Sequence, residues 1–139
     1  MPSKSHRIDE LIQRFRGGPI DAYYLGYIEC FNQQLYFEAH EVLEQLWLPQ
    51  RSGPDGDFYK GLIQLAGAFV HLQKNRMKPA RSLFRLAEVN LRKYPFVHHH
   101  LEVTTVLKMI QQCVTQLELA QLSPGDYSLK IFPKLVLVK

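Results

Sequence analysis

The order of apolar and polar residues along the chain predicts a series of amphipathic helices separated by breaks that contain glycine or proline. Apolar residues recur every three or four positions, which is the period of a helix with one face in a core. This pattern predicts helices over about 8–15, 22–33, 36–48, 57–75, 79–94 and 103–120. Pro79 suits the first turn of a helix, whereas Pro49 and Pro95 end the helices before them.

Two segments give this series of helices its expected architecture. In 57–75, apolar residues occupy more than half of the helix circumference, which is typical of a helix enclosed by its neighbours. The C-terminal segment 131–138 is apolar but contains Pro133, which predicts an extended strap rather than a sheet strand. The sequence therefore predicts an all-α single domain over 1–139. It is expected to be a compact bundle of five to six helices, with one central helix wrapped by the others and an extended C-terminal tail.

The composition agrees with one small domain inside the cell. The chain has 139 residues, of which 46% are hydrophobic, so it can bury one core. Cys30 and Cys113 lie among apolar neighbours on predicted helices and are expected to stay free. The longest apolar run, 62–70, is too short to cross a bilayer, and 1–16 lacks the apolar stretch of a secretory signal. We expect a cytoplasmic protein without a membrane partner.

The predicted helix 36–48 carries two ionisable residues, His40 and Glu44, inside its apolar stripe. Burying such a group is costly unless it is paired, hydrogen-bonded or bound to a metal, so partners are expected. Gln64 and His71 are the best candidates, because they lie on the polar line of the central helix. The predicted buried polar cluster or ligand pocket consists of His40, Glu44, Trp47, Gln64 and His71.

Two functions are open for this cluster. The first, which we favour, is a non-catalytic binding or scaffold module, in which the cluster either fixes the register of the helices or holds a small ligand. The second is a metal-dependent hydrolase, because the segment His40-Glu41-Val42-Leu43-Glu44 is similar to the zinc-protease pattern with two ligands at i and i+4. In that mechanism, His40, Glu44 and His71 bind a divalent metal and Glu41 activates its water.

A third function follows from charge. The formal net charge is only +4, but basic residues are concentrated between Lys74 and Lys93. This concentration indicates an interaction domain for polyanions, nucleic acid included, through Arg81, Arg85, Arg92 and Lys93. These residues are not interleaved with aromatic side chains for base stacking, so a solvated helix face is the simpler interpretation.

The run of three histidines, 98–100, is not expected to be a site. It follows the helix end at Pro95, where a solvated loop is predicted, and consecutive side chains should point apart. Nucleophilic catalysis is not indicated either, because neither cysteine neighbours a histidine and no Gly-x-Ser-x-Gly turn occurs.

Two motifs, FEAHE at 37–41 and GLIQLA at 61–66, together resemble the family known as domain of unknown function 309. The resemblance extends over 27–94 and implies an all-helical bundle in which one central helix is wrapped by the others. This sequence departs from the family at Pro79-Ala80, where the family usually has Gly-Ala. Because no activity is established for the family, the resemblance implies no reaction. The resemblance places six residues on positions of the family's motifs: His40, Glu41, Glu44, Trp47, Gln64 and His71.

Overall fold

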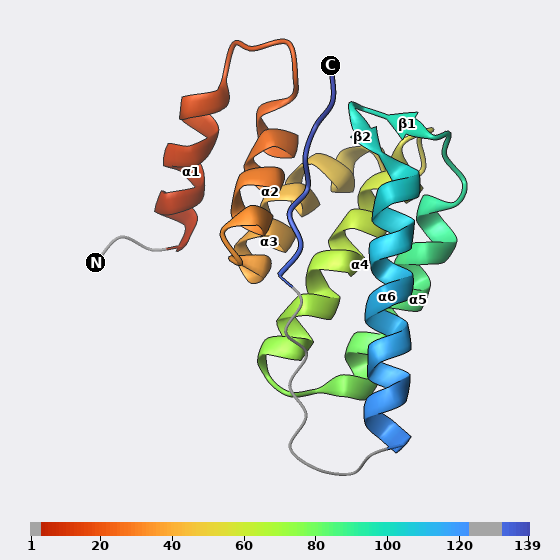
Figure 1. Ribbon diagram of the computed structural model, residues 1–139. Coiled ribbons are helices and arrows are strands. Elements are labelled where there is room, and N and C mark those ends of the chain that lie inside the picture. The colour runs from red at the N-terminus through yellow and green to blue at the C-terminus, as the bar shows by residue number, and fades with distance from the viewer. Residues whose placement is uncertain (1–3, 123–131) are drawn as a thin grey trace.

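The structure, a computed structural model, describes residues 4–122 and 132–139. Its elements are α1 (Lys4–Phe15), α2 (Ala22–Asn32), α3 (Tyr36–Trp47), a 3-10 turn (Leu48–Gln50), α4 (Gly56–Gln73), α5 (Met77–Leu91), β1 (Val97–His98), β2 (Leu101–Glu102) and α6 (Val103–Leu122). Helix α4 runs through the middle, with α3 on one side, α5 on the other and α6 against α5 (Figure 1). The predicted all-α bundle with one central helix is confirmed.

Local chemistry sets the ends of several helices. The carboxylate of Asp21 caps α2, since it accepts hydrogen bonds from the backbone N–H groups of Tyr23 at 2.8 Å and Tyr24 at 3.2 Å. After α2, Gln34 has a φ of 63°, and after α4, Asn75 has a φ of 56°. This left-handed conformation is a common way to stop a helix.

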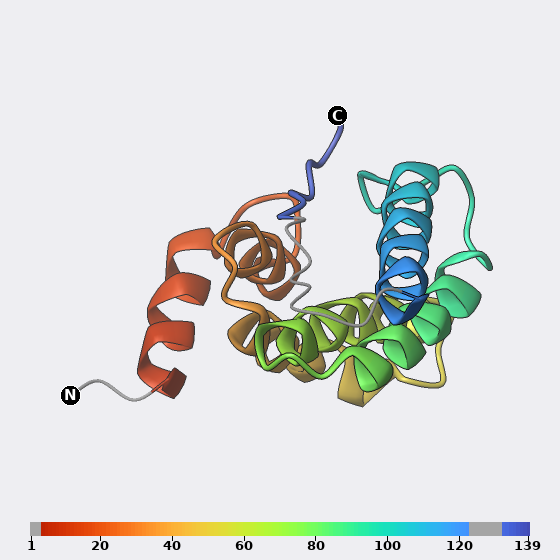
Figure 2. The same ribbon diagram turned by 60° about the horizontal axis from the view of Figure 1, so that its bottom comes forward.

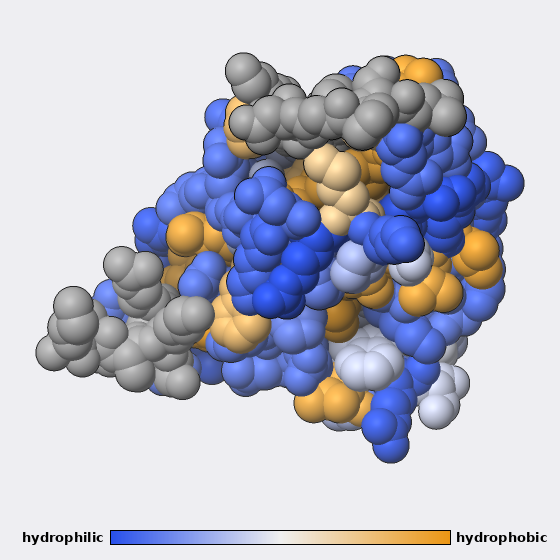
Figure 3. Space-filling view, turned by 90° about the horizontal axis from the view of Figure 1, so that it is seen from below, coloured by the Kyte–Doolittle hydropathy of each residue, from blue (hydrophilic) through white to orange (hydrophobic). Residues whose placement is uncertain are grey.

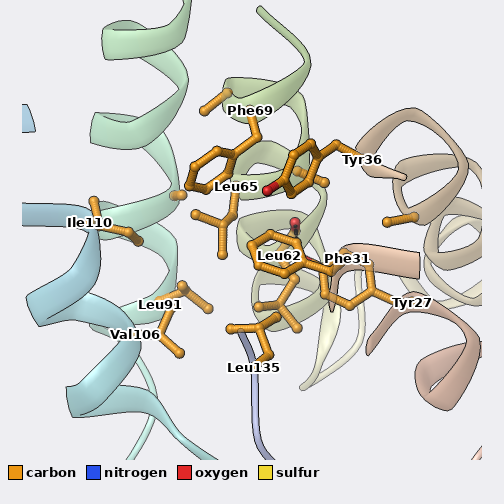
Figure 4. Packing of buried hydrophobic residues seen from close by; sticks show 14 of the residues in the cluster. Tyr27, Phe31, Tyr36, Leu62, Leu65, Phe69, Leu91, Val106, Ile110 and Leu135 are labelled. Atoms are coloured by element: carbon orange, nitrogen blue, oxygen red, sulfur yellow. Dashed lines mark hydrogen bonds between the residues drawn. The ribbon is translucent and has the colours of Figure 1, made fainter. Parts of the chain in front are cut away.

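The core forms where α4 faces the surrounding segments. Leu62, Leu65 and Phe69 of α4 are almost completely buried. Figure 4 shows them surrounded by Tyr27 and Phe31 of α2, Tyr36 of α3, Leu91 of α5, Val106 and Ile110 of α6, and Leu135 of the tail. The Tyr27 hydroxyl donates to the Leu62 carbonyl at 2.7 Å, so its polar group is satisfied inside the apolar cluster. Removal of this apolar surface from water is the main stabilising contribution.

The C-terminal tail, 132–139, is an extended strap between α2 and α6 (Figures 1 and 2). Asn32 of α2 holds it by two hydrogen bonds: its amide donates to the Leu135 carbonyl at 2.9 Å and accepts from the Leu135 N–H at 2.7 Å. The predicted extended tail is confirmed for this part. The first residue of the predicted strap, Ile131, lies outside the described residues.

A small antiparallel hairpin of β1 and β2 precedes α6, and the sequence did not predict it. Its turn residues, His99 and His100, have φ values of 46° and 63°, as in the tight turns that match the twist of paired strands. Leu137 of the tail forms an isolated antiparallel bridge with Leu101 of β2. Strands of two residues are too short for an alternating pattern to be recognised, which explains why they were missed.

Membrane-spanning helices are absent from the part of the chain that the structure describes. None of its helices is both long and apolar enough to cross a bilayer. The face shown in Figure 3 is mainly hydrophilic, and its hydrophobic residues form separate patches.

Candidate functional site

His40 and Glu44 form an ion pair on adjacent turns of α3. Nε2 of His40 lies 3.2 Å from Oε2 of Glu44, and their side chains are 33% and 42% exposed. The sequence predicted that both residues are fully buried. The structure instead places them at the edge of the core. Solvent and solutes can reach this pair.

Helix geometry explains the difference. The buried residues of α3 are Tyr36, Ala39, Val42 and Leu43. At about 100° per residue, the middle of this stripe lies roughly 90° from His40 and still farther from Glu44. Val42 packs against Ile8 and Ile12 of α1 in a second small cluster. Its burial shifts the buried face of α3 away from the His40–Glu44 pair. The expected burial rested on a stripe centred on His40 itself.

Several buried polar atoms of α3 and α4 have no hydrogen-bond partner within the protein. Among the described residues they are the Tyr36 hydroxyl, Nδ1 of His40, Nε1 of Trp47 and Nδ1 of His71. Each such group costs about 1–3 kcal/mol. Tyr36 lies within the aromatic core, where its ring stacks on Phe69 at 4.9 Å and burial raises the pKa of its hydroxyl to about 12. Three of the four groups belong to α3.

Gln64 of α4 faces α5 rather than α3. Its Oε1 accepts a hydrogen bond at 2.8 Å from the side-chain amide of Asn90, a buried residue of α5. Gly67, one turn further along α4, also faces α5, since a Cβ there would lie 3.1 Å from Leu83. The structure thus pairs Gln64 with Asn90 instead of bringing it to the His40–Glu44 pair.

The three metal ligands of the hydrolase hypothesis do not converge. Among the described His, Cys, Asp and Glu residues, the group whose ligand atoms lie within 4.8 Å of one another does not contain His40, Glu44 or His71. Glu41, the expected base, is half-buried on the same helix. A metal bound by His40 and Glu44 would therefore lack its third protein ligand.

The group that does converge consists of Asp55, His98 and His99. Nε2 of His98 lies 2.7 Å from Oδ1 of Asp55, and Nε2 of His99 lies 2.8 Å from Oδ2. The expectation that these consecutive histidines point apart is wrong, because His99 leaves the strand with a positive φ and the alternation of strand side chains ends there. Sequence reasoning missed this group.

The electrostatics of Asp55 reflect its two histidine partners. Burial by itself raises the pKa of Asp55, but the hydrogen bonds from His99 and His98 and their positive charge outweigh it. The pKa of Asp55 therefore lies below its ordinary value. The Tyr59 ring is parallel to the His99 ring, with 5.9 Å between the ring centroids. Burial, together with the charge of Asp55, raises the pKa of the Tyr59 hydroxyl to about 12.

The basic residues of the polyanion hypothesis all have carboxylate neighbours. Arg81 and Arg85 lie near Glu118, Arg92 near Glu88, and Lys93 near Asp57. The shortest of these ion pairs, those of Arg85 and Lys93, measure 2.8 Å. Neighbouring carboxylates reduce the positive potential that a polyanion would meet, so the geometry does not favour this function.

A comparison with protein families found one match. Residues 24–83 match the model of the family described as Domain of unknown function (DUF309), whereas the sequence motifs indicate a resemblance over 27–94. The match includes the α3 pair and leaves out the histidines of the hairpin. No curated protein matches the chain. The resemblance carried by the FEAHE and GLIQLA motifs is confirmed, because both motifs lie within the segment 24–83 that matches the DUF309 model.

Proposed function

We propose that this protein is a non-catalytic helical binding module, and that the polar face of α3 around His40 and Glu44 holds its ligand. One observation carries this proposal: an accessible ion pair lies on the same helix as two buried nitrogen atoms that have no hydrogen-bond partner within the protein. The pair is exposed enough for a ligand to reach. Nδ1 of His40 and Nε1 of Trp47, on the same helix, are buried and unpaired.

The energetics favour binding over a structural role. A partly exposed His–Glu pair at i, i+4 contributes only about 0.3–0.5 kcal/mol to stability. The nitrogens of His40 and Trp47 have no hydrogen-bond partner within the protein, and a buried polar group that lacks every partner costs about 1–3 kcal/mol. Apolar residues at these positions would stabilise α3 more than the polar residues that are present. Residues that do not favour stability are typical of functional sites.

The charge of α3 favours a cationic ligand. Glu41 and Glu44 are spaced by three residues, roughly 60° apart around the helix, and α3 contains no lysine or arginine. The Phe37 ring is 40% exposed and lies 6.0 Å from the His40 ring, so the surroundings of the pair are partly aromatic. The ligand class that fits is an amine or a guanidinium group, in a small molecule or in a partner chain.

A cytoplasmic location belongs to the same proposal. Cys30 and Cys113 are both free and buried. Unpaired cysteines are typical of proteins in a reducing compartment.

The test uses Trp47, the single tryptophan of the chain, as its reporter. Amide and indole N–H signals of ¹⁵N-labelled protein are recorded with a set of primary amines and guanidines, and with carboxylates of similar size as controls. The amines should shift the Trp47 indole signal and the amides of α3, whereas the carboxylates should not. His40→Ala and Glu44→Gln should each remove these shifts while the protein stays folded.

The opposite result would identify a structural role. If no amine shifts these signals, and both substitutions lower the free energy of unfolding by more than about 2 kcal/mol, then His40 and Glu44 stabilise the fold and do not bind a ligand.

A further inference from the structure

We propose that Asp55, His98 and His99 form a binding site for one divalent transition-metal ion, with zinc as the cation that fits best. The site joins the loop before α4 to the turn of the β1–β2 hairpin, at the end of the bundle where α4 begins (Figure 1). Two of its three ligands lie outside the segment that matches the family model. It is independent of the proposed ligand site on α3.

The donor atoms already lie close together, since one ligand atom of each of the three residues lies within 4.8 Å of the others. Each carboxylate oxygen of Asp55 faces the Nε2 atom of a different imidazole, at 2.7 and 2.8 Å. Around a tetrahedral zinc ion with bonds of about 2.1 Å, donor atoms lie roughly 3.4 Å apart, so a widening of roughly 0.6 Å admits the ion. Two histidines and one carboxylate leave a further position open for water or an added ligand.

A simple salt bridge does not account for this arrangement as well. One histidine is enough to pair with a carboxylate, yet both oxygens of Asp55 are used. The side chains of Asp55, His98 and His99 are 26%, 23% and 40% exposed, so a hydrated ion can reach them. Imidazole nitrogen and carboxylate oxygen are both ordinary zinc ligands.

The turn is conformationally unfavourable for histidine. His99 and His100 both have positive φ, which costs about 1–2 kcal/mol per residue outside glycine and asparagine. Asn-Gly is the usual choice for such a turn. In exchange, His99 reaches Asp55 and Nδ1 of His100 bonds to the Val138 carbonyl at 2.9 Å. Strain of this kind is typical of functional sites.

Hydrogen bonds from two tyrosines hold the backbones that carry the ligands. The Tyr94 hydroxyl donates to the Pro54 carbonyl at 2.8 Å and accepts from the Phe58 N–H at 2.9 Å, and so fixes the loop on both sides of the aspartate. The Tyr24 hydroxyl donates to the His99 carbonyl at 2.9 Å. Metal ligands that are held in place before the ion arrives bind it more tightly.

Aromatic rings also restrict the two imidazoles. The His98 ring lies 4.8 Å from both the Phe58 ring and the Tyr94 ring, and the Tyr59 ring is parallel to that of His99. These rings limit rotation of the imidazoles and shield one side of the site from water. An apolar surround of this kind strengthens metal coordination.

The test is a calorimetric titration of the full chain, purified without an affinity tag and treated with a chelator, with zinc chloride. Cobalt chloride is titrated in parallel, because its absorption spectrum reports coordination by nitrogen and oxygen. We expect one ion per chain and a higher Tm with zinc. His99→Asn and Asp55→Asn should each weaken zinc binding by about 100-fold.

His100→Asn is the matched control. His99 and His100 are adjacent and both left-handed, and asparagine tolerates that conformation, so both substitutions preserve the turn. Of these two turn residues, His99 faces Asp55 and His100 bonds to Val138 instead, so His100→Asn should keep zinc affinity within about threefold of wild type. His40→Ala should also leave zinc binding unchanged, which separates this test from that of the α3 site.

Two results would overturn the proposal. One is the absence of stoichiometric zinc and cobalt binding by folded wild-type protein. The other is equal loss of affinity in His99→Asn and His100→Asn, which would indicate adventitious binding to surface histidines. Circular dichroism and Tm in the presence of chelator check that each variant folds. If His99→Asn does not fold, the zinc affinity of Asp55→Asn provides the test instead.

Discussion

The ion pair on α3 and the Asp55 group are both contacts between carboxylate and imidazole, but they depend on the fold in different ways. His40 and Glu44 are one helical turn apart, so they meet wherever α3 is helical. Asp55 is 43 residues from His98 and 44 residues from His99, and they meet only because the loop before α4 packs against the hairpin. A perturbation of that packing should therefore affect the second contact and spare the first.

The largest effect is expected for Gly56→Ala. A Cβ at this position would clash with the carbonyl oxygen of Arg51, so the loop beside Asp55 has to shift. We expect the free energy of unfolding in urea to fall by about 2–3 kcal/mol, with loss of zinc binding. Gly18→Ala is the control, because the nearest atom to its added Cβ is 3.8 Å away. Wild-type stability in Gly56→Ala would contradict the described loop.

Tyr94→Phe should have a smaller effect on the same packing. The substitution keeps the ring but removes the hydroxyl that bonds to the backbone of Pro54 and Phe58. We expect a loss of about 1–2 kcal/mol in the free energy of unfolding and roughly tenfold weaker zinc binding. The ligand shifts of the α3 site should be unchanged. An unaltered urea midpoint would show that these hydrogen bonds do not hold the loop.

Acidification of the chelator-treated protein should show the contribution of Asp55 alone. Since the pKa of Asp55 is lower in the folded protein than in the unfolded chain, its contribution to stability is present above the ordinary aspartate pKa and is lost as the pH falls through the folded value. Between pH 5 and pH 2, wild type should lose more stability than Asp55→Asn, by about 1 kcal/mol at most. Parallel pH curves from urea denaturation would contradict this.

The smallest effect is expected for Glu44→Gln. The pair with His40 is local and partly exposed, so the free energy of unfolding should fall by no more than about 0.5 kcal/mol, with the loop and zinc binding unchanged. Urea denaturation measures this change. A loss above about 2 kcal/mol would mean that the pair is part of the core, and the contrast between the two contacts would disappear.

Much of the fold and one part of the candidate site could be predicted from the sequence alone. The helix period, the Asp21 cap and the prolines at helix boundaries are local signals, and most predicted helices agree with the structure within a few residues. The start of α1 at Lys4, earlier than Ile8, was missed because its first turn carries no apolar stripe. The contact between His40 and Glu44 follows from helical spacing alone.

The rest of the site could not be predicted, because it depends on how segments pack. The burial of His40 was overestimated, since the packing of Val42 against α1 turns the apolar stripe of α3. Gln64 bonds to Asn90 on a neighbouring helix, a choice among partners that spacing does not reveal. The run of three histidines at 98–100 was the one sequence signal for the hairpin site. It could be interpreted only once the turn was known, in which His99 and His100 adopt positive φ.

By itself, the sequence determined the class of this protein: the positions of its helices, the identity of its central helix, its resemblance to the DUF309 family and the pair on α3. These properties depend on periodicity and on contacts between residues close in the chain, for which backbone geometry leaves few alternatives. The tertiary structure alone decided which faces are buried, which partner each polar group finds, and that Asp55 meets His98 and His99. Such contacts join distant segments, and their formation depends on the packing of the whole core.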